Sequence, residues 1–592
     1  MDTVKDDSTS TPLQLRLVQR LSRVAPEHWF WVVASGVAAL YGLRSAWFFF
    51  HMNAPVHFDD GYVTSVGERL LDGHWLPYVD AASHRGPVMY WMAALAQAIG
   101  GRMEWYGVRA LCSLAFLTSL AGVWGSAFCR GRRFVAAFGA LGFVFISIAL
   151  LEVQTVFGLV GEAMATPWLM MAFLATSLAL RSRGEPSARP PGNAEGGLER
   201  ARALRARCAL LAAAGVLSAL SGLTKQTYLI VVGPLLLWTL SVTLSESAEG
   251  EAAADESTAR RWAPVAALAV GWIVPPLLVV LLYVAKGHWG TFYYWFYRYN
   301  VDVYMAPFQG VRVGKTLYHW ARDYGYLSFA MVLLLTSVAS QYAAPLLSPR
   351  TSLAKAYARH GFELTVLLQA LLSLAIGFST LRFWPQYFLP PVPWFALLVG
   401  LSLEHSLGKS PYQPRVANES CLPLLVTTLG LAGFAVCMLE QGMYTLVHAR
   451  QNGQFVDARP ERLCTDIDRL APAGKPIYIW GFDAEYYVTC QRHAVSRYVY
   501  STLIAGQVPP DWSIHPEWSA RNSVDTLLSE LEAADPPLIL DSPQRAHGVS
   551  MTQIEPLNAY LREHYCDTGV VRTNDGRRMN AWQRRDLCGK GK

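Results

Sequence analysis

The sequence predicts a mainly α-helical membrane protein that crosses the bilayer many times and carries a small α/β domain after its last span. Of its 592 residues, 52% are hydrophobic and only 16% are charged, whereas charged residues make up about a quarter of soluble domains. The hydrophobic residues form runs of about 20, the length that crosses a bilayer core. After about residue 445 these runs stop, and short strand-like and helix-like segments follow.

The first apolar run follows a polar tail and lacks the small-residue cleavage site of a signal peptide, so we interpret the run as an anchor. We expect about eleven spans, near 28–50, 107–128, 134–152, 163–180, 208–223, 227–244, 263–285, 326–346, 361–380, 386–402 and 421–440. The apolar segment 87–100 has about 14 residues and is short for a span. We predict a helix that lies along the membrane interface there.

The loops between the spans predict the topology. With the N-terminus inside, every predicted cytoplasmic loop is basic, as in the segment from Arg181 to Arg207. An odd number of spans then places the C-terminus outside. The expected domains are a cytoplasmic tail (1–27), a transmembrane domain (28–444) with a first outer loop (51–106), and an extracytoplasmic α/β domain (445–592). The net charge of +6 is modest and divided among these loops, which argues against nucleic-acid binding.

Within the last domain, KPIYIWGF and PPLILDSP are typical of buried strands, and SVDTLLSELEAA and PLNAYLREHY of amphipathic helices. The same domain contains four of the nine cysteines. In an oxidising compartment four cysteines allow two disulfides and three pairings. We favour Cys464–Cys490 and Cys566–Cys588 because these partners are close in sequence, with free thiols as the alternative.

Charged residues recur at the tight outer turns between spans. Asp59 and Asp60 follow the first span, Glu162 lies at the next outer turn, and Lys225 and Arg382 lie at later ones. This pattern predicts that acidic and basic groups converge on one outward-facing cavity. A carboxylate can take a proton from an attacking hydroxyl, and basic groups can bind a phosphate and stabilise the charge that develops on it. The pattern therefore fits transfer of a group from a lipid phosphate to an acceptor outside the membrane.

Four segments resemble the GT-C membrane glycosyltransferases. The resemblance is closest to the bacterial branch related to dolichyl-phosphate-mannose protein mannosyltransferases and lipid A aminoarabinose transferases. Their first outer loop is similar to FDDGYVTSVGERLLDGHWLPYVDAASHRGPVMYW, and their Gly-Leu-x-x-Lys turn to SGLTKQTYLIVV. Their Arg-Phe/Tyr-x-x-x-Tyr-Phe turn is similar to TLRFWPQYFLPPVPWFALL, and the outer domain of many members to IYIWGFDAEYYVTCQRHAVSRYVY.

This resemblance implies a polyprenyl-phosphate sugar as donor. It also implies an inverting transfer to a hydroxyl, amine or phosphate of a glycan, lipid or protein acceptor, outside a bacterial inner membrane. Asp59 matches the catalytic base. Asp60 stands where Glu is more usual and would be a supporting acid. Lys225 and Arg382 match basic positions on the phosphate side, and Arg85 stands where Lys is commoner.

Glu162 and Gln386 also stand at positions where the family has polar residues. Glu162 matches an acidic position in the second outer turn, and Glu152 stands at the other side of that turn. Gln386 replaces a frequent His, which weakens a proton-shuttle role there. His57 and His84 lie near the acids, so a divalent metal remains an alternative, although a lone histidine near an interface is usually structural.

Less specific interpretations of the same residues remain open. Asp59 and Asp60 also suit a helix N-terminus, and Lys225 and Arg382 also suit interfacial anchors. The aromatic segment Phe292–Asn300 is typical of an interface belt and would also suit a sugar or lipid groove. For the whole chain, the alternatives are a secondary transporter and a non-catalytic scaffold.

Overall fold

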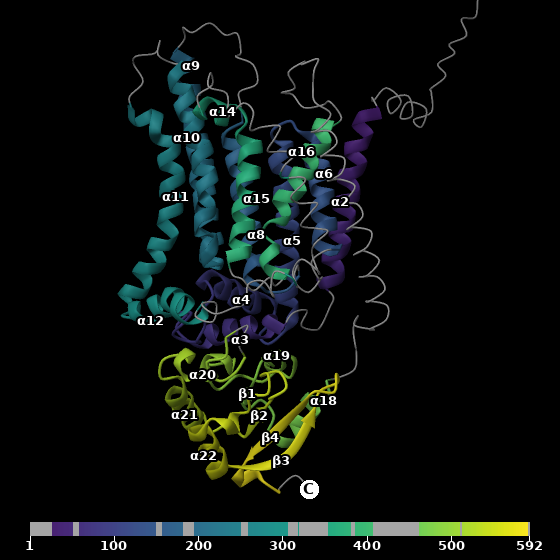
Figure 1. Cartoon of the computed structure of the whole chain (residues 1–592), viewed down its shortest axis with the longest axis vertical. Helices are drawn as coiled ribbons and strands as arrows, with labels where there is room; N and C mark the ends of the chain where they lie inside the picture. The colour runs from purple at the N-terminus through teal and green to yellow at the C-terminus, as the bar shows by residue number, and fades with distance from the viewer. Residues whose placement is uncertain are drawn as a thin grey trace, which may run out of the picture.

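The computed structural model describes residues 26–50, 58–149, 157–181, 194–249, 258–305, 353–379, 385–406, 461–508 and 512–589, with single residues at 318 and 335. Long helices form one layer, and the C-terminal region (461–508 and 512–589) lies beyond one end of it (Figure 1). The predicted fold class, a polytopic helical membrane protein with a small C-terminal α/β region, is confirmed.

The long helices of the layer run side by side in Figure 1. They are α2 (Pro26–Phe50), α5 (Trp105–Phe128), α6 (Arg133–Ala149), α8 (Gly161–Ala179), α9 (Ala194–Thr224), α10 (Val232–Glu249), α11 (Thr258–Ala285), α15 (Gly361–Ser379) and α16 (Val392–Ser406). Among the described residues, five helical segments are long and apolar enough to cross a membrane. Apart from residue 335, the predicted spans 326–346 and 421–440 lie outside those residues, so the total of eleven stays a prediction.

Shorter elements connect the long helices. At the end nearest the C-terminal region, α3 (Phe58–Asp72) and α4 (Pro87–Gly100) lie across the layer (Figure 1). The segment 87–100, predicted to lie along the interface, therefore forms a helix. Its backbone at Ala93 packs closely on α3, because Gly67 of α3 has no side chain at the point of contact. The other connecting elements are η1 (Gln226–Val231), α12 (Trp289–Tyr293), the π-helical η2 (Tyr294–Tyr304), α14 (Leu353–Arg359) and η4 (Pro385–Phe388).

The C-terminal region contains a four-stranded sheet in the order β1-β2-β4-β3. Its elements are α18 (Arg462–Leu470), β1 (Tyr478–Trp480), α19 (Glu485–Thr489), α20 (Thr502–Ala505), η5 (Pro516–Trp518), α21 (Ser523–Ala534), β2 (Leu538–Asp541), η6 (Met551–Gln553), α22 (Glu555–His564), β3 (Tyr565–Arg572), β4 (Arg578–Arg584) and η7 (Arg585–Leu587). Strands β1 and β2 are parallel, and the other two pairs are antiparallel. The predicted strands β1 and β2 and helices α21 and α22 are confirmed.

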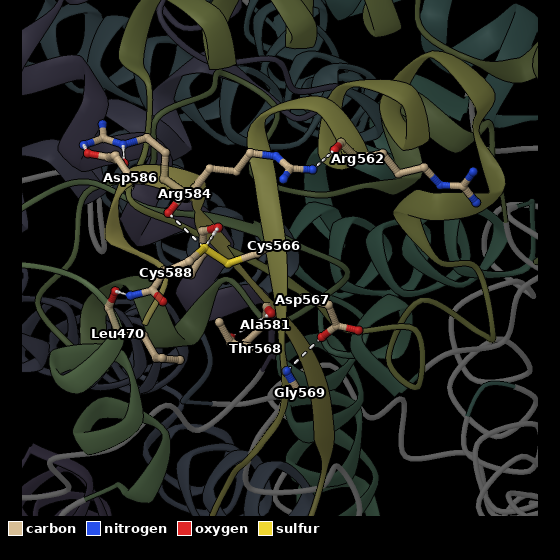
Figure 2. The surroundings of a disulfide bond; sticks show 12 residues. Leu470, Arg562, Cys566, Asp567, Thr568, Gly569, Ala581, Arg584, Asp586 and Cys588 are labelled. Carbon is tan, nitrogen blue, oxygen red and sulfur yellow. Dashed lines mark hydrogen bonds and ion pairs between the residues drawn. A yellow bond between two sulfur atoms is a disulfide. The ribbon is translucent and has the colours of Figure 1, made fainter. Parts of the chain in front are cut away.

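Both favoured disulfides are confirmed. Cys464–Cys490 joins α18 to the end of α19. Cys566–Cys588 joins β3 to the residue that follows η7, and Figure 2 shows it beside the strands. The structure therefore contains disulfides, and not the alternative of free thiols, at these four positions.

One cluster of buried apolar side chains continues from the helical layer into the C-terminal region. It contains Val63, Val66 and Leu70 of α3 together with Ile477 and Tyr487. Buried apolar area is the main stabilising contribution to such a contact. The two parts are therefore packed together, and α3 lies at their junction.

Candidate active site

Helix α3 carries the two adjacent acids in its first turn. Asp59 is 4% exposed and Asp60 is fully buried. A buried carboxylate is costly unless it is paired, and each of these forms an ion pair with a different arginine. The ion pairs show that the acids do more than begin a helix.

Asp60 connects three parts of the helical layer. Its Oδ2 lies 2.9 Å from Nη2 of Arg109 on α5, and neither side chain is exposed. Its Oδ1 accepts a hydrogen bond of 2.6 Å from the backbone N–H of Leu159, just before α8. Arg109 also donates to the carbonyl of Phe157. These contacts support the expected supporting role of Asp60.

Asp59 faces a different partner. Its Oδ1 lies 2.6 Å from Nη2 of Arg85, in the turn before α4. The other terminal nitrogen of this guanidinium, Nη1, is buried and has no hydrogen-bond partner among the described residues. The guanidinium carbon lies 5.4 Å from the centre of the Tyr62 ring, a cation–π contact. Arg85 thus retains a hydrogen-bond donor that a ligand oxygen could use.

A second acid–base pair lies at the same end of the layer. Lys225, between α9 and η1, places Nζ 2.8 Å from Oε1 of Glu162 in the first turn of α8. Its ammonium also lies 5.2 Å from the centre of the Tyr387 ring on η4. The structure therefore brings together Glu162 and Lys225, which are distant in sequence.

Close backbone packing brings these two pairs together. A Cβ on Gly86 would lie 2.0 Å from the carbonyl oxygen of Leu223 at the end of α9. The side-chain amide of Gln226 donates a 3.0 Å hydrogen bond to the His84 carbonyl. The turn that carries Arg85 is thereby held against the turn that carries Lys225.

Other predicted positions lie outside the described part of the chain. Arg382, Glu152 and His57 are among them, so their roles stay predictions. Element η4 begins three residues after Arg382 and packs its Tyr387 ring on Lys225. Gln386 on the same element is buried.

The aromatic segment Phe292–Asn300 has two different faces. Phe292, Trp295 and Tyr299 are buried, and the Tyr299 ring lies 5.8 Å from that of His84. Tyr293 and Tyr297 are exposed and stack on each other with ring centres 5.7 Å apart. The exposed face suits an interface belt, whereas the buried face supports the loop that holds Arg85.

The sequence offers His57 and His84 as metal ligands, but the acid–histidine cluster found among the described residues lies elsewhere. Glu68, Asp72 and His493 place donor atoms within 4.8 Å of one another. Nη2 of Arg102 already lies 2.5 Å from an oxygen of Glu68 and 2.5 Å from one of Asp72. We interpret this cluster as an ion-pair network between α3 and the C-terminal region.

The sequence did not predict that the C-terminal region contacts α3 beside the acids. A Cβ on Gly61 would lie 2.1 Å from the backbone nitrogen of Glu485, so α19 lies directly on α3. The Tyr500 ring stacks on that of Tyr62, with centres 4.3 Å apart. Arg69 donates a 2.7 Å hydrogen bond to a carbonyl of the same region. The glycine directly after the acid pair is the signal that could have indicated such a close approach.

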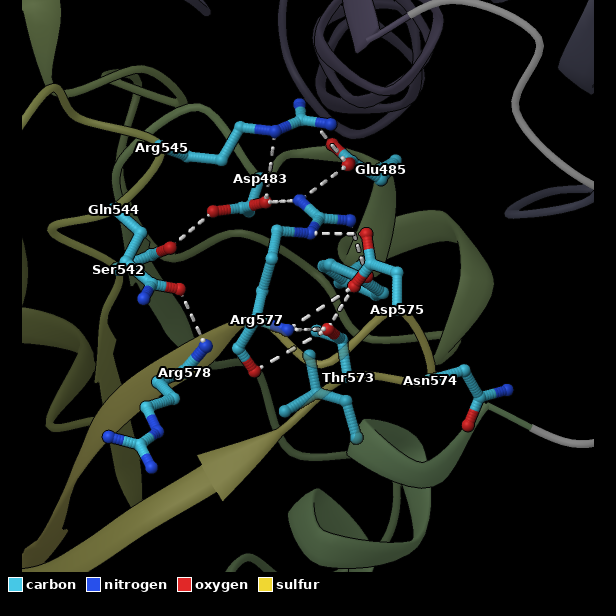
Figure 3. Close-up of polar contacts among 12 residues, drawn as sticks. Asp483, Glu485, Ser542, Gln544, Arg545, Thr573, Asn574, Asp575, Arg577 and Arg578 are labelled. Atoms are coloured by element: carbon cyan, nitrogen blue, oxygen red, sulfur yellow. Dashed lines mark hydrogen bonds and ion pairs between the residues drawn. The ribbon is translucent and has the colours of Figure 1, made fainter. Parts of the chain in front are cut away.

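Figure 3 shows a charged cluster at this contact. Arg577 pairs with Asp483 and lies 3.4 Å from Glu485, and Arg545 lies 3.5 Å from Glu485. Burial, and next the charge of Asp483, raise the pKa of Glu485 to about 7. Burial also raises the pKa of Asp483. Perturbed acids beside a candidate site are themselves candidates for function.

No protein-family model matches the chain, and no curated protein is significantly similar to it in sequence. ArnT from Cupriavidus metallidurans in the apo state is similar in structure, with a TM-score of 0.50 and 14% identity over 94% of this chain and 98% of that chain. The same protein bound to undecaprenyl phosphate gives a TM-score of 0.49 with the same identity and coverage. An oligosaccharyltransferase from Archaeoglobus fulgidus, tethered with an acceptor peptide, gives a TM-score of 0.43 and 13% identity over 94% of this chain and 74% of that chain. The similarity to apo ArnT confirms the expected GT-C fold.

Proposed function

We propose that the chain is a membrane glycosyltransferase that moves a sugar from a polyprenyl-phosphate donor to an acceptor on the extracytoplasmic side of a bacterial plasma membrane. The observation that carries this proposal is the convergence of the Asp59–Arg85 and Glu162–Lys225 pairs at one end of the helical layer. A lipid phosphate could reach this end from the bilayer. ArnT, which shares the fold, has been solved with undecaprenyl phosphate, and this supports the choice of carrier.

The basic residues receive the donor phosphate in this proposal. Arg85 has a buried donor nitrogen without a partner in the described part of the chain, and Lys225 carries the second positive charge. When the bond between the sugar and the phosphate oxygen breaks, negative charge grows on that oxygen. Arg85 and Lys225 stabilise this charge, and Arg382 remains a proposed third cation at the same phosphate.

Asp59 is the proposed base. The acceptor hydroxyl attacks the anomeric carbon from the face opposite the phosphate, and its proton passes to Asp59. Without a donor, Arg85 neutralises Asp59. A bound phosphate competes for the same guanidinium, so donor binding loosens Arg85 from Asp59. The base is thereby freed only when a donor is present.

Replacement of Asp59 by Asn tests this role. The change keeps the size of the side chain and removes the base, so we expect transfer to fall by about 10²–10⁴-fold. Transfer is measured in membranes supplied with a radiolabelled hexose or pentose on undecaprenyl phosphate. Binding of undecaprenyl phosphate should persist, because Lys225 and Arg85 remain.

The matched control is Asp72→Asn, at the other end of α3, whose side chain is 59% exposed. It should retain transfer at nearly the wild-type rate. Near-normal transfer by the Asp59→Asn protein at equal expression would reject the catalytic role and favour a purely structural acid pair.

A further inference from the structure

In the C-terminal region, the carboxyl ends of the parallel strands β1 and β2 face α3. Strands β1 and β2 are parallel, so their carboxyl ends meet at one edge. Asp483 and Glu485 follow β1, and Arg545 follows β2. Ligands of open α/β sheets bind outside these carboxyl ends. Figure 3 shows Arg545 and Glu485 on the side of the cluster nearest a purple helix, and the contact at Gly61 identifies α3 as the neighbour.

Glu485 has an unsatisfied oxygen at this edge. The residue is 4% exposed. Its Oε1 lies 3.4 Å from Arg577 and 3.5 Å from Arg545, both long contacts. Its Oε2 is buried and has no hydrogen-bond partner among the residues that the structure describes. A buried polar oxygen without a partner is costly and uncommon in native proteins, so a ligand that donates a hydrogen bond there would be stabilising.

The charge of the cluster favours an uncharged ligand. Three carboxyl groups, on Asp483, Glu485 and Asp575, contact two guanidinium groups, on Arg545 and Arg577. The pKa of Glu485 is raised to about 7 by burial and by Asp483. When Glu485 carries its proton, two negative charges balance two positive ones. Arg545 is one-third exposed, lies 3.5 Å or more from the acids and donates a 3.3 Å hydrogen bond from Nη1 to the Phe482 carbonyl, so its other terminal nitrogen, Nη2, is the donor left for a ligand.

Aromatic rings connect this edge with the proposed catalytic acid. The Phe482 ring lies 5.0 Å from the Tyr500 ring, and the Tyr500 ring stacks on Tyr62 beside Arg85. The charges of both Asp59 and Glu485 contribute to raising the pKa of Tyr500, after the larger effect of burial. A carboxyl oxygen and a guanidinium side by side suit the vicinal hydroxyls of a sugar, and neighbouring rings offer apolar surface to its C–H face.

We propose that Glu485 and Arg545 form a binding subsite for a neutral carbohydrate acceptor between the C-terminal region and α3. The inference rests on the proposed glycosyl transfer and adds the acceptor class to it. Oε2 of Glu485 accepts a hydrogen bond from one sugar hydroxyl, and Arg545 donates to the neighbouring oxygen.

The test is saturation-transfer NMR on the full-length protein in nanodiscs with three probes: mannotriose, chitotriose and galactotriose. We expect at least one of them to bind. Glu485→Ala should weaken that binding by about 10-fold, because a sugar hydroxyl loses its partner. Glu485→Gln keeps an acceptor oxygen and should stay within about 3-fold of the wild type. The matched control is Glu555→Gln, an exposed acid at the start of α22, and it should bind as the wild type does.

A lysine tripeptide is tested as a fourth probe. Three outcomes overturn the proposal: none of the three sugars binds, Glu485→Ala binds the sugar as tightly as the wild type does, or the protein binds the lysine tripeptide and no sugar. Binding of undecaprenyl phosphate is measured on the same samples and should be unchanged in the Glu485 variants. If wild-type protein binds a sugar but not undecaprenyl phosphate, the proposed transfer fails while the subsite stands. If it binds only undecaprenyl phosphate, the subsite alone fails.

Discussion

Replacement of Asp60 by Asn separates the two adjacent acids, because Asp60 is proposed to hold the site together without taking part in the chemistry. The carboxylate forms a fully buried ion pair of 2.9 Å with Arg109 and accepts a 2.6 Å hydrogen bond from Leu159. Asparagine can still accept the backbone hydrogen bond through its side-chain oxygen. The change therefore removes the charge of the acid and leaves the guanidinium of Arg109 buried without its counter-ion.

The expected cost follows from that uncompensated charge. Removal of one partner of a buried ion pair destabilises proteins by about 3–5 kcal/mol. Retention of the Leu159 hydrogen bond argues for the lower part of this range. Removal of both charges, as in Asp60→Asn with Arg109→Leu, should recover much of the loss, because an apolar replacement of a buried pair is often neutral.

The assay is thermal unfolding of the purified protein in detergent, together with its expression level. Asp60→Asn should lower the midpoint clearly and should reduce transfer only in proportion to the folded protein that remains. Asp72→Asn serves as the control, since its side chain is 59% exposed. Unfolding of Asp60→Asn at the wild-type temperature would refute the structural role of Asp60, and so would a double variant that is no more stable than Asp60→Asn.

Three further predictions concern other contacts. Gly86→Ala places a Cβ 2.0 Å from a carbonyl of α9, so it should cost about 1–3 kcal/mol in thermal unfolding and weaken undecaprenyl-phosphate binding. Gly233→Ala, whose Cβ would meet no atom of the described residues within 4 Å, should do neither. Loss of the Cys464–Cys490 disulfide, whose cysteines are 26 residues apart in sequence, should lower the free energy of unfolding by about 3–4 kcal/mol. Thermal unfolding of the double-serine variant measures this loss, and an unchanged midpoint would contradict it. Burial and Asp483 raise the pKa of Glu485 from 4.5 to about 7, so the contribution of Glu485 to stability should be complete below pH 4.5 and should fall by about 3 kcal/mol as the pH rises from there through 7. Unfolding midpoints of the wild type and Glu485→Gln measured against pH should show this fall in the wild type only, and an equal fall in both proteins would contradict the assignment.

The sequence predicted what depends on local pattern. Apolar runs identified the helical layer because a bilayer core requires about 20 apolar residues for each span. Short apolar segments between turn residues identified β1 and β2. Cys464–Cys490 and Cys566–Cys588 were chosen because they are near in sequence, and the structure contains both bonds.

Contacts between distant segments could not be predicted in this way. Arg109 lies 49 residues from Asp60 and inside an apolar run. A charge in such a run is unusual, but the sequence does not indicate its partner. Strand β3 has four consecutive exposed residues instead of an alternating pattern. Its pairing with β4, and the pairing of β4 with β2, depend on tertiary packing. The contact of Glu485 with Gly61 depends on how the sheet lies against α3. Such contacts follow from packing, which a single sequence does not specify.

Helix geometry gives a physical reason why two adjacent acids take different roles. Successive residues of an α-helix point about 100° apart, so Asp59 and Asp60 cannot face the same partner. One direction leads into the helical layer, where Asp60 meets Arg109 on α5. The other leads to the turn before α4, where Asp59 meets Arg85. A fully buried carboxylate requires a fixed counter-ion, so Asp60 has a structural role beside Arg109. Asp59 lies beside Arg85, a group that a ligand could displace.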